Sequence, residues 1–124
     1  GNLQEIHAMY NRLDVLPQSI GHLTQLRRLI LQGNRLTELP DSLGGLASLI
    51  DLDLRDNRLA ALPESFGQLQ KLRQLDLRAN TLRTLPESIR ALTSLEKLDL
   101  RWNSLASLPN WLEELERRGC TIYI

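Results

Sequence analysis

A period of 23 residues runs through most of this 124-residue chain. Asparagine recurs at positions 11, 34, 57, 80 and 103, and proline at 17, 40, 63, 86 and 109, always directly after a leucine. Self-similarity at a fixed period of roughly 20–50 residues is typical of repeat architectures, in which stacked units share one continuous core. The sequence therefore predicts a single domain over 1–124, with five stacked units over about 3–115.

Each unit has an extended half and a helical half. In the stretch LRRLILQGN, Leu29 and Leu31 alternate with positions expected to face outward, which is the period of a half-buried strand. In the stretch LPDSLGGL, the leucines follow at steps of four and three, which is the period of a helix. Proline suits the first turn of such a short helical or 3₁₀ segment. One unit is therefore expected to place a short strand opposite a short helical turn.

The periodic asparagines are expected to be structural. The chain turns out of each strand into the interior, where backbone groups lack a ladder partner. A buried carboxamide offers two donors and an acceptor, so it can satisfy backbone groups in its own turn and the next. Replacing Asn57 by leucine should then leave buried polar groups unsatisfied, at a cost of about 1–3 kcal/mol.

These units resemble the leucine-rich repeat, LxxLxLxxNxLxxLPxxIGxL, in its 23-residue form. That form is similar to the repeats of intracellular Ras-related scaffold proteins, Roco-type proteins and bacterial effectors. The resemblance implies an α/β fold, namely a right-handed solenoid with parallel strands on its concave face and short helical or 3₁₀ turns on its convex face. It also implies that partner proteins dock on the concave face.

The two ends depart from the repeat. The first unit carries Ile6 and Ala8 where later units carry leucines, and it shows no polar capping element, which terminal repeats normally need. The last segment, about 110–124, predicts a C-terminal cap. Trp111, Leu112 and Leu115 lie on one stripe of an amphipathic helix that is longer than its predecessors. Gly119 stands where a helix C-cap glycine would, and the segment 120–124 alternates like a final strand.

Composition excludes several classes of function. Fifteen basic and fifteen acidic residues cancel, so no long-range field would attract the chain to nucleic acid or to anionic lipid. No apolar run approaches the roughly 20 residues that a membrane helix needs. Cys120 is the only cysteine, which excludes an intramolecular disulfide. These features favour a cytoplasmic protein, or one delivered into a host cytoplasm if it is an effector.

Rows of charged side chains are expected to follow the strands on the concave face. Three aspartates stand in one row and three arginines in the next, and neighbouring strands lie about 4.8 Å apart, so the arginines can neutralise the aspartates diagonally. The rows are either a self-balanced, solvated lattice or a partner surface. The candidate partner-binding residues are Tyr10, Arg28, Ile30, Asp53, Arg55, Asp76, Arg78, Asp99, Arg101 and Trp102.

Trp102 is the sharpest of these candidates. The same position of the preceding units holds Gly33, Asp56 and Ala79, so packing there does not demand an aromatic side chain. Tryptophan, tyrosine and arginine are enriched among binding hot spots. The alternative is that the ring folds over the neighbouring cap. Tyr10 holds the same position at the other end.

The sequence offers no catalytic residue, no metal ligand set and no cofactor motif. His7 and His22 lack a second ligand at a suitable spacing. Cys120 is expected to be a buried residue of the cap, although Arg117 and Arg118 lie near it. The aspartate row is flat and lined with arginines, so nothing raises one carboxyl pKa there.

The sequence therefore predicts a non-enzymatic module for protein–protein interaction. Its strands would hold the exposed side chains rigid, so that binding costs little ordering entropy. One alternative is the recognition segment of a larger signalling or effector protein with a GTPase, kinase or ubiquitin-ligase domain. Another is a structural unit that self-associates through its uncapped N-terminal end.

Overall fold

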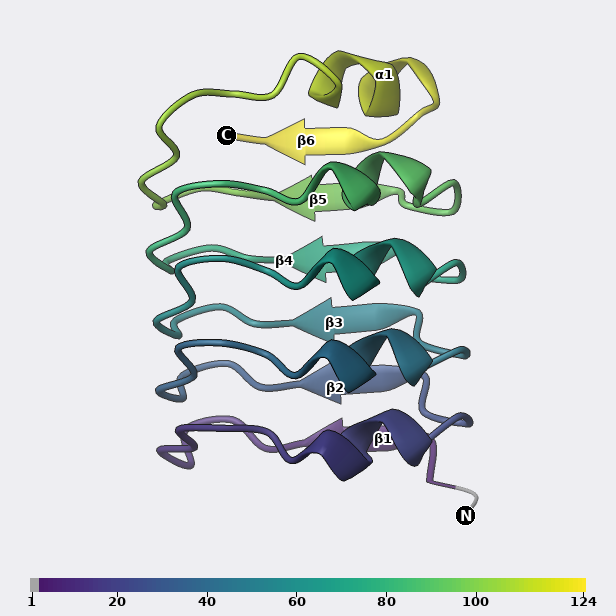
Figure 1. Ribbon diagram of the computed structural model, residues 1–124, viewed down its shortest axis with the longest axis vertical. Helices are drawn as coiled ribbons and strands as arrows, with labels where there is room; N and C mark the ends of the chain where they lie inside the picture. Colours follow the sequence, from purple (N-terminus) through teal and green to yellow (C-terminus); the bar gives the residue numbers. More distant parts are fainter. Residues whose placement is uncertain (1–2) are drawn as a thin grey trace.

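Six parallel strands follow one another in the order of the sequence and form one sheet along the whole stack (Figure 1). The computed structural model describes residues 3–124. The strands are β1 (Glu5–His7), β2 (Arg28–Ile30), β3 (Asp51–Asp53), β4 (Gln74–Asp76), β5 (Lys97–Asp99) and β6 (Thr121–Tyr123). Partners from β1 to β5 are 23 residues apart, whereas Lys97 pairs with Thr121, 24 residues later. The predicted solenoid is confirmed.

A short 3₁₀ helix returns the chain on the opposite side of each of the first four turns. These helices are η1 (Gln18–His22), η2 (Asp41–Gly45), η3 (Glu64–Gln68) and η4 (Glu87–Ala91). Pro40 is extended (φ −70°, ψ 148°), and its carbonyl accepts the first helical hydrogen bond from the Leu43 N–H at 3.0 Å. The prolines therefore precede the helices as N-caps, which corrects their expected place inside the first turn. None of the helices within residues 3–124 has the length and apolar character to cross a membrane.

Leucine fills the space between the sheet and the 3₁₀ helices. Leu29 from a strand, Leu43 from a 3₁₀ helix and Leu26 from the connection between them are all fully buried. Phe66 is the largest fully buried side chain, so one aromatic ring joins an otherwise aliphatic core. Because each turn is only one chain thick, these side chains are covered by the turns on either side, as expected for stacked units.

The asparagines form a ladder of hydrogen bonds between turns. The Asn57 Oδ1 accepts from the Leu36 N–H at 3.1 Å, and its Nδ2 donates to the carbonyls of Leu31 and Leu54 at 3.0 and 3.1 Å. Asn34, Asn80 and Asn103 repeat these bonds. The expected structural role is confirmed for these four asparagines, whereas Asn11 is exposed and its side chain makes no hydrogen bond within residues 3–124. One further correction concerns direction. Each side chain joins its own turn to the preceding turn, not to the next one.

Adjacent 3₁₀ helices pack through a glycine–serine contact. A Cβ built on Gly67 would lie 2.7 Å from the Ser88 Cβ and 2.9 Å from the Ser88 carbonyl oxygen. Gly21 and Gly44 meet Ser42 and Ser65 in the same way. The fourth turn carries Arg90 at this position instead, because no 3₁₀ helix follows it. Its guanidinium pairs with Glu114 of the cap at 3.1 Å.

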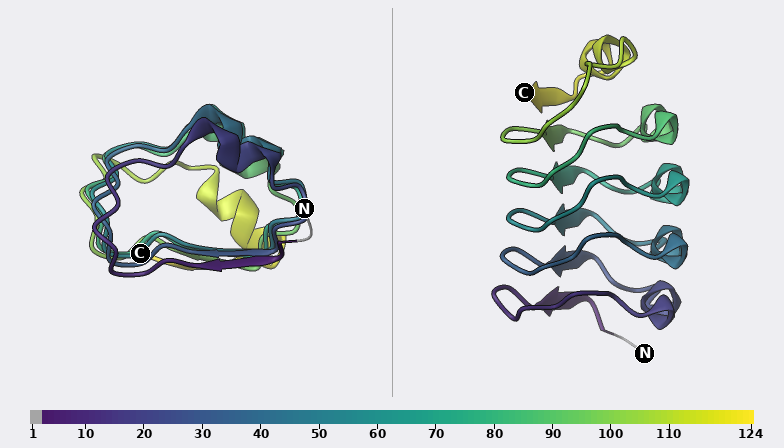
Figure 2. Two further views of the ribbon diagram at one scale, coloured as in Figure 1. Left: turned by 90° about the horizontal axis from the view of Figure 1, so that it is seen from below. Right: turned by 60° about the vertical axis from the view of Figure 1, so that its left-hand side comes forward.

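The cap consists of α1 (Leu112–Arg117) and β6. Viewed along the stack, α1 lies across the end of the core, whereas the 3₁₀ helices lie in one file at the side (Figure 2). Gly119 has φ +99°, the Gly119 N–H bonds to the Glu116 carbonyl at 3.0 Å, and the Cys120 N–H bonds to the Leu115 carbonyl at 3.0 Å. This is a Schellman C-cap, so the predicted cap glycine is confirmed.

Two details of the expected cap are wrong. Ile124 lies outside β6 and is 65% exposed, because the strand ends at Tyr123. Trp111 is only partly buried, since it precedes α1 and packs against the core from the edge. Cys120 is buried, as expected.

The Cys120 thiol should react slowly. Its burial raises the pKa of the thiol from 9.0 to about 11, with a smaller contribution from the charge of Glu116. Because the thiolate is the reactive form, two pKa units correspond to about 100-fold less thiolate at pH 8. We expect alkylation by iodoacetamide at pH 8 to be at least about 100-fold slower in the folded protein than in 6 M guanidinium chloride. Equal rates would show that the cap opens readily.

Candidate functional site

Aspartate and arginine side chains alternate across β3, β4 and β5 on the outer face of the sheet. We call this face the sheet face, and we call Asp53, Arg55, Asp76, Arg78, Asp99 and Arg101 the Asp/Arg ladder. The Arg55 Nη2 lies 2.8 Å from the Asp53 Oδ2, and the equivalent distances are 2.6 Å for Arg78–Asp76 and 2.7 Å for Arg101–Asp99. Each arginine therefore binds mainly to the aspartate two residues before it.

Diagonal ion pairs then join the strands. The Arg55 Nε lies 3.5 Å from the Asp76 Oδ2, and the Arg78 Nε lies 3.3 Å from the Asp99 Oδ2. The diagonal neutralisation expected from the two rows is thus present, although it is secondary to the pairs along each strand. Three carboxylates and three guanidinium groups form one neutral network, which the Arg55 Nη2 extends to the Gln32 Oε1 of the preceding turn at 2.9 Å.

The aspartates do not lie open to solvent as expected. Asp99 is completely buried and Asp53 is 9% exposed, because the arginines fold back over them. Burial favours the neutral form of Asp99. The hydrogen bonds from the Arg101 guanidinium and backbone N–H, with the charges of Arg101 and Arg78, outweigh burial and lower the pKa of Asp99 below its ordinary value. The ladder therefore presents mainly arginine side chains beside Asp53 and Asp99, whereas the side chain of Asp76 (19%) is about as exposed as that of Arg78 (22%).

The position three residues after each of the strands β1 to β5 has a left-handed backbone. Tyr10, Asp56, Ala79 and Trp102 have φ between 55° and 61°, and Gly33 has φ 75°. This conformation suits glycine and is uncommon for bulky residues, at a cost of roughly 1 kcal/mol. The sequence showed that tryptophan is unusual at this position. The need for a positive φ was not predicted, although Gly33 in the same row could have indicated it.

Aromatic and cationic side chains meet at the cap end of the sheet face. Trp102 is 69% exposed, and the Arg101 guanidinium lies 5.6 Å from the centre of its ring. Arg101 also lies 5.0 Å from the ring of Tyr123, over which Lys97 lies at 5.5 Å. Trp102, Arg101, Tyr123 and Lys97 form what we call the aromatic corner. Tyr123 was not among the predicted residues, because it belongs to the cap and has no counterpart in the repeats.

The remaining predicted residues lie elsewhere. Tyr10 packs against Gly33 at the N-terminal end, four strand spacings or about 19 Å from the aromatic corner. Ile30 is 8% exposed, so it belongs to the surface of the core and offers little area to a partner. Arg28 pairs with Asp51 at 3.3 Å and with Glu5 at 3.6 Å. The predicted set is therefore spread across the whole sheet face.

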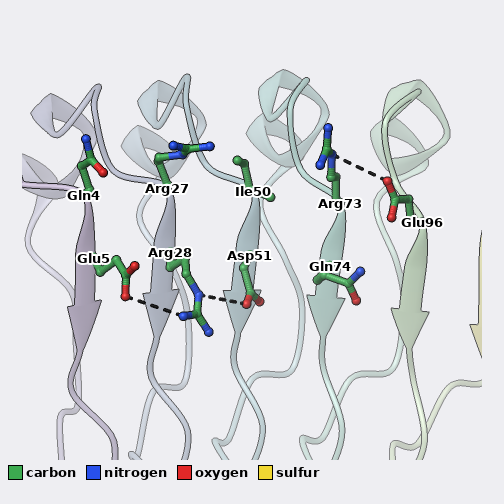
Figure 3. A pocket seen from close by; sticks show the side chains of 9 residues that line it. All are labelled: Gln4, Glu5, Arg27, Arg28, Ile50, Asp51, Arg73, Gln74 and Glu96. Atoms are coloured by element: carbon green, nitrogen blue, oxygen red, sulfur yellow. Dashed lines mark hydrogen bonds and ion pairs between the residues drawn. The ribbon is translucent and has the colours of Figure 1, made fainter.

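A groove crosses the sheet face where the strands begin (Figure 3). We call it the strand-start groove. It is lined by Gln4, Glu5, Arg27, Arg28, Ile50, Asp51, Arg73, Gln74 and Glu96. Five of these nine residues directly precede a strand, and this row was not among the predicted site residues. The side chains of residues between a turn and a strand do not alternate simply between the core and the solvent. The direction in which they point could therefore not be predicted from the sequence.

Within residues 3–124, no group of three or more histidine, cysteine, aspartate or glutamate side chains is arranged to hold a metal ion. His7 lies on β1, where its Nε2 is 2.8 Å from the Glu5 Oε1, and it is half-exposed. That hydrogen bond lowers the pKa of Glu5, opposed by desolvation and aided by the charge of Arg28.

Comparison with known proteins identifies the architecture. A sequence profile described as a leucine-rich repeat region matches residues 4–118. No curated protein matches the chain significantly. Among solved structures, a leucine-rich repeat protein of Leptospira interrogans is 32% identical, with a TM-score of 0.77 over 99% of this chain and 37% of that chain.

Two plant receptors are also similar. The leucine-rich repeat ectodomain of the receptor kinase SOBIR1 from Arabidopsis thaliana is 27% identical, with a TM-score of 0.80 over 95% of this chain and 66% of that one. The plant peptide hormone receptor RGFR1, in complex with RGF2, is 28% identical, with a TM-score of 0.84 over 97% of this chain and 20% of that one. The chain thus spans less than two thirds of the length of each of these structures.

Proposed function

We propose that this chain, which belongs to the leucine-rich repeat family, binds a partner protein on its sheet face, the concave face of the family's solenoid. The observation that carries the proposal is Trp102. Its ring is 69% exposed and its backbone is left-handed, so the residue adds strain without covering the core. An exposed aromatic side chain held in a strained conformation supports a role in binding.

The Asp/Arg ladder supports the same proposal. Arginine side chains are normally flexible, and ordering one on binding costs about 0.5–1.5 kcal/mol. Arg55, Arg78 and Arg101 are already held by two or more bonds each to aspartates of the same network. A partner would therefore meet a rigid surface, with charges that set its orientation and with the aromatic corner as an anchor.

The test is removal of the Trp102 ring. Ala79 has the same left-handed backbone one turn earlier, so Trp102→Ala is expected to keep the fold and the melting temperature. Affinity capture from a lysate of the source cells should identify a protein that wild type retains and Trp102→Ala loses. Titration of that purified partner should show binding weakened about 30-fold, which corresponds to a hot spot of about 2 kcal/mol.

The matched control is Val15→Ala, which removes another exposed apolar side chain at the far end of the stack. It should bind as wild type does. If Trp102→Ala and wild type capture the same proteins with equal affinity, the aromatic corner is not the site.

Such a module could serve a larger protein. The similar structures are longer than this chain, and one of them is a peptide hormone receptor in complex with RGF2. We therefore also propose that the chain acts as the recognition segment of a longer signalling or effector protein. Its cytoplasmic location stays a prediction that rests on the single, buried Cys120.

Self-association is the second candidate. The first turn exposes Leu3 at 49% and Val15 at 66%, while Ile6 and Leu13 are only partly buried. Two copies could cover these side chains by meeting through their first turns. Sedimentation should then show a mass that rises with concentration in wild type and not in Val15→Glu. A constant monomer mass would exclude this candidate.

A further inference from the structure

Positive charge gathers where the strands begin, although the whole chain is neutral. The four connections into β2 to β5 cover residues 22–28, 45–51, 68–74 and 91–97. They contain five basic side chains, Arg27, Arg28, Lys71, Arg73 and Lys97, against two carboxylates, Asp51 and Glu96. Adding Glu5 of β1 still leaves an excess of two positive charges at this edge, which comes from Lys71 and Lys97 beside the strand-start groove, since the groove itself is lined by three arginines and three carboxylates.

The excess is concentrated around one apolar side chain. Arg27 and Lys71 make no ion pair with any carboxylate of residues 3–124, whereas Arg28, Asp51 and Glu5 satisfy one another. Ile50 lies half-buried between Arg27 and Arg73 in the outer row of the groove (Figure 3). Arg27, Ile50 and Lys71 also line a neighbouring depression that contains no carboxylate. Ile50 is therefore an apolar spot flanked by three cations.

Backbone recognition is not available in this groove. The Arg27 carbonyl accepts hydrogen bonds from the Ile50 and Asp51 N–H groups, and the Ile50 carbonyl accepts from Arg73 and Gln74 in the same way. Strands β2 to β5 are paired on both sides, so a bound peptide cannot add as a further strand there. A bound peptide must therefore cross the strands, and the side chains of the groove must recognise it.

We propose that the strand-start groove binds an extended acidic segment of the partner, with two carboxylates three residues apart and an apolar residue between them. This inference rests on the proposed function and names the chemistry of its ligand. Arg27 and Arg73 begin two strand spacings apart, about 9.6 Å. Three residues of polyproline II chain span about 9.3 Å, so carboxylates at i and i+3 match the two guanidinium groups.

The ion pair already present at Arg73 can be exchanged for one with a ligand carboxylate. Arg73 pairs with Glu96 at 3.6 Å, and both side chains are about 60% exposed. Exposed pairs of this kind contribute about 0–1 kcal/mol, so a ligand carboxylate can replace Glu96 at little cost. Glu5 and Asp51 stay paired with Arg28, so only Arg27 and Arg73 are left to meet ligand charges. The groove therefore suits a peptide with two separated carboxylates better than the dense row of phosphates of a nucleic acid.

Fluorescence anisotropy with labelled peptides tests the proposal. The probes are fluorescein-labelled nonapeptides of serine and proline, with a central leucine and two glutamates spaced two, three or four residues apart. A matched peptide carries two glutamines at the three-residue spacing. We expect the three-residue glutamate peptide to bind most tightly, and the glutamine peptide to bind at least 10-fold more weakly. Arg27→Glu should weaken the glutamate peptide by at least 10-fold, and Ile50→Ser by at least threefold.

Arg35→Glu is the matched control, since Arg35 is an exposed arginine in the connection after β2, whereas Arg27 precedes this strand, and the change should leave binding within twofold. Equal binding of glutamate and glutamine peptides, equal weakening by Arg35→Glu, or no binding of any peptide up to 1 mM would overturn the proposal. Tighter binding of labelled oligothymidylate that Arg27→Glu abolishes would also overturn it, by assigning the groove to nucleic acid. None of these outcomes affects the Trp102→Ala capture, so the two proposals fail separately.

Discussion

Asn57→Leu should lower the free energy of unfolding by about 1–3 kcal/mol. The Leu36 N–H donates only to the Asn57 Oδ1, so the substitution leaves a buried donor without a partner. The carbonyls of Leu31 and Leu54 each lose one hydrogen bond but keep another, from Asn34 and Asn80. Their loss therefore costs less free energy than the loss of the partner of the Leu36 N–H. Urea unfolding followed by circular dichroism at pH 7 would measure the change.

Asn11→Leu is the control for this prediction. Asn11 starts the series, is exposed, and makes no side-chain hydrogen bond within residues 3–124. Its substitution should change the free energy of unfolding by less than about 0.5 kcal/mol, as is usual for surface positions. Equal losses at both positions would show that the asparagines act locally and not through contacts between turns.

Asp99→Ala should cost about 3 kcal/mol, the lower end of the range for removing one partner of a buried ion pair. The buried carboxylate accepts hydrogen bonds from the Arg101 guanidinium and N–H, and the Arg78 Nε lies 3.3 Å away. The cost stays at the lower end because Arg78 and Arg101 both reach solvent. Asp41→Ala removes an exposed carboxylate that makes no ion pair within residues 3–124, so it should be nearly neutral and serves as the control.

The same carboxylate should make the protein sensitive to acid. The pKa of Asp99 is lower in the folded chain than its ordinary value, so the unfolded chain binds a proton first as pH falls. The stabilisation by Asp99 is therefore complete above the unfolded pKa of about 3.9 and is lost as pH falls through the lower, folded value. Free energies of unfolding at pH 7, 5, 4, 3 and 2 should decline less steeply for Asp99→Asn than for wild type. An identical decline would contradict the role of Asp99.

The repeat pattern predicted the architecture well because its residues have fixed structural requirements. Four of the five asparagines satisfy backbone groups, and most of the repeat leucines face the core, so their spacing predicted the stack and its register. The end of the cap helix was predicted from Gly119, whose position after the amphipathic stripe indicated a helix end.

The candidate site was less predictable because surface geometry depends on neighbours. Alternation along a strand places Asp99 outward, but it does not show that Arg101 and Arg78 bury it. Ile30 takes an outward position in the pattern and is nonetheless covered. Tyr123 reaches the aromatic corner because β6 pairs with β5. The paired residues are 24 positions apart, so the 23-residue period of the repeats does not predict this pairing.

The Asp/Arg ladder also makes the stack extendable. Each ladder contact joins a residue to its own strand or to the strand 23 residues later, so the units that contribute β3 and β4 offer equivalent charges to both neighbours. Duplication of one such unit, for example residues 49–71, would insert another aspartate and arginine into a network that stays neutral. The sheet face can therefore lengthen by about 4.8 Å per duplication while the cap and the first turn keep their existing contacts.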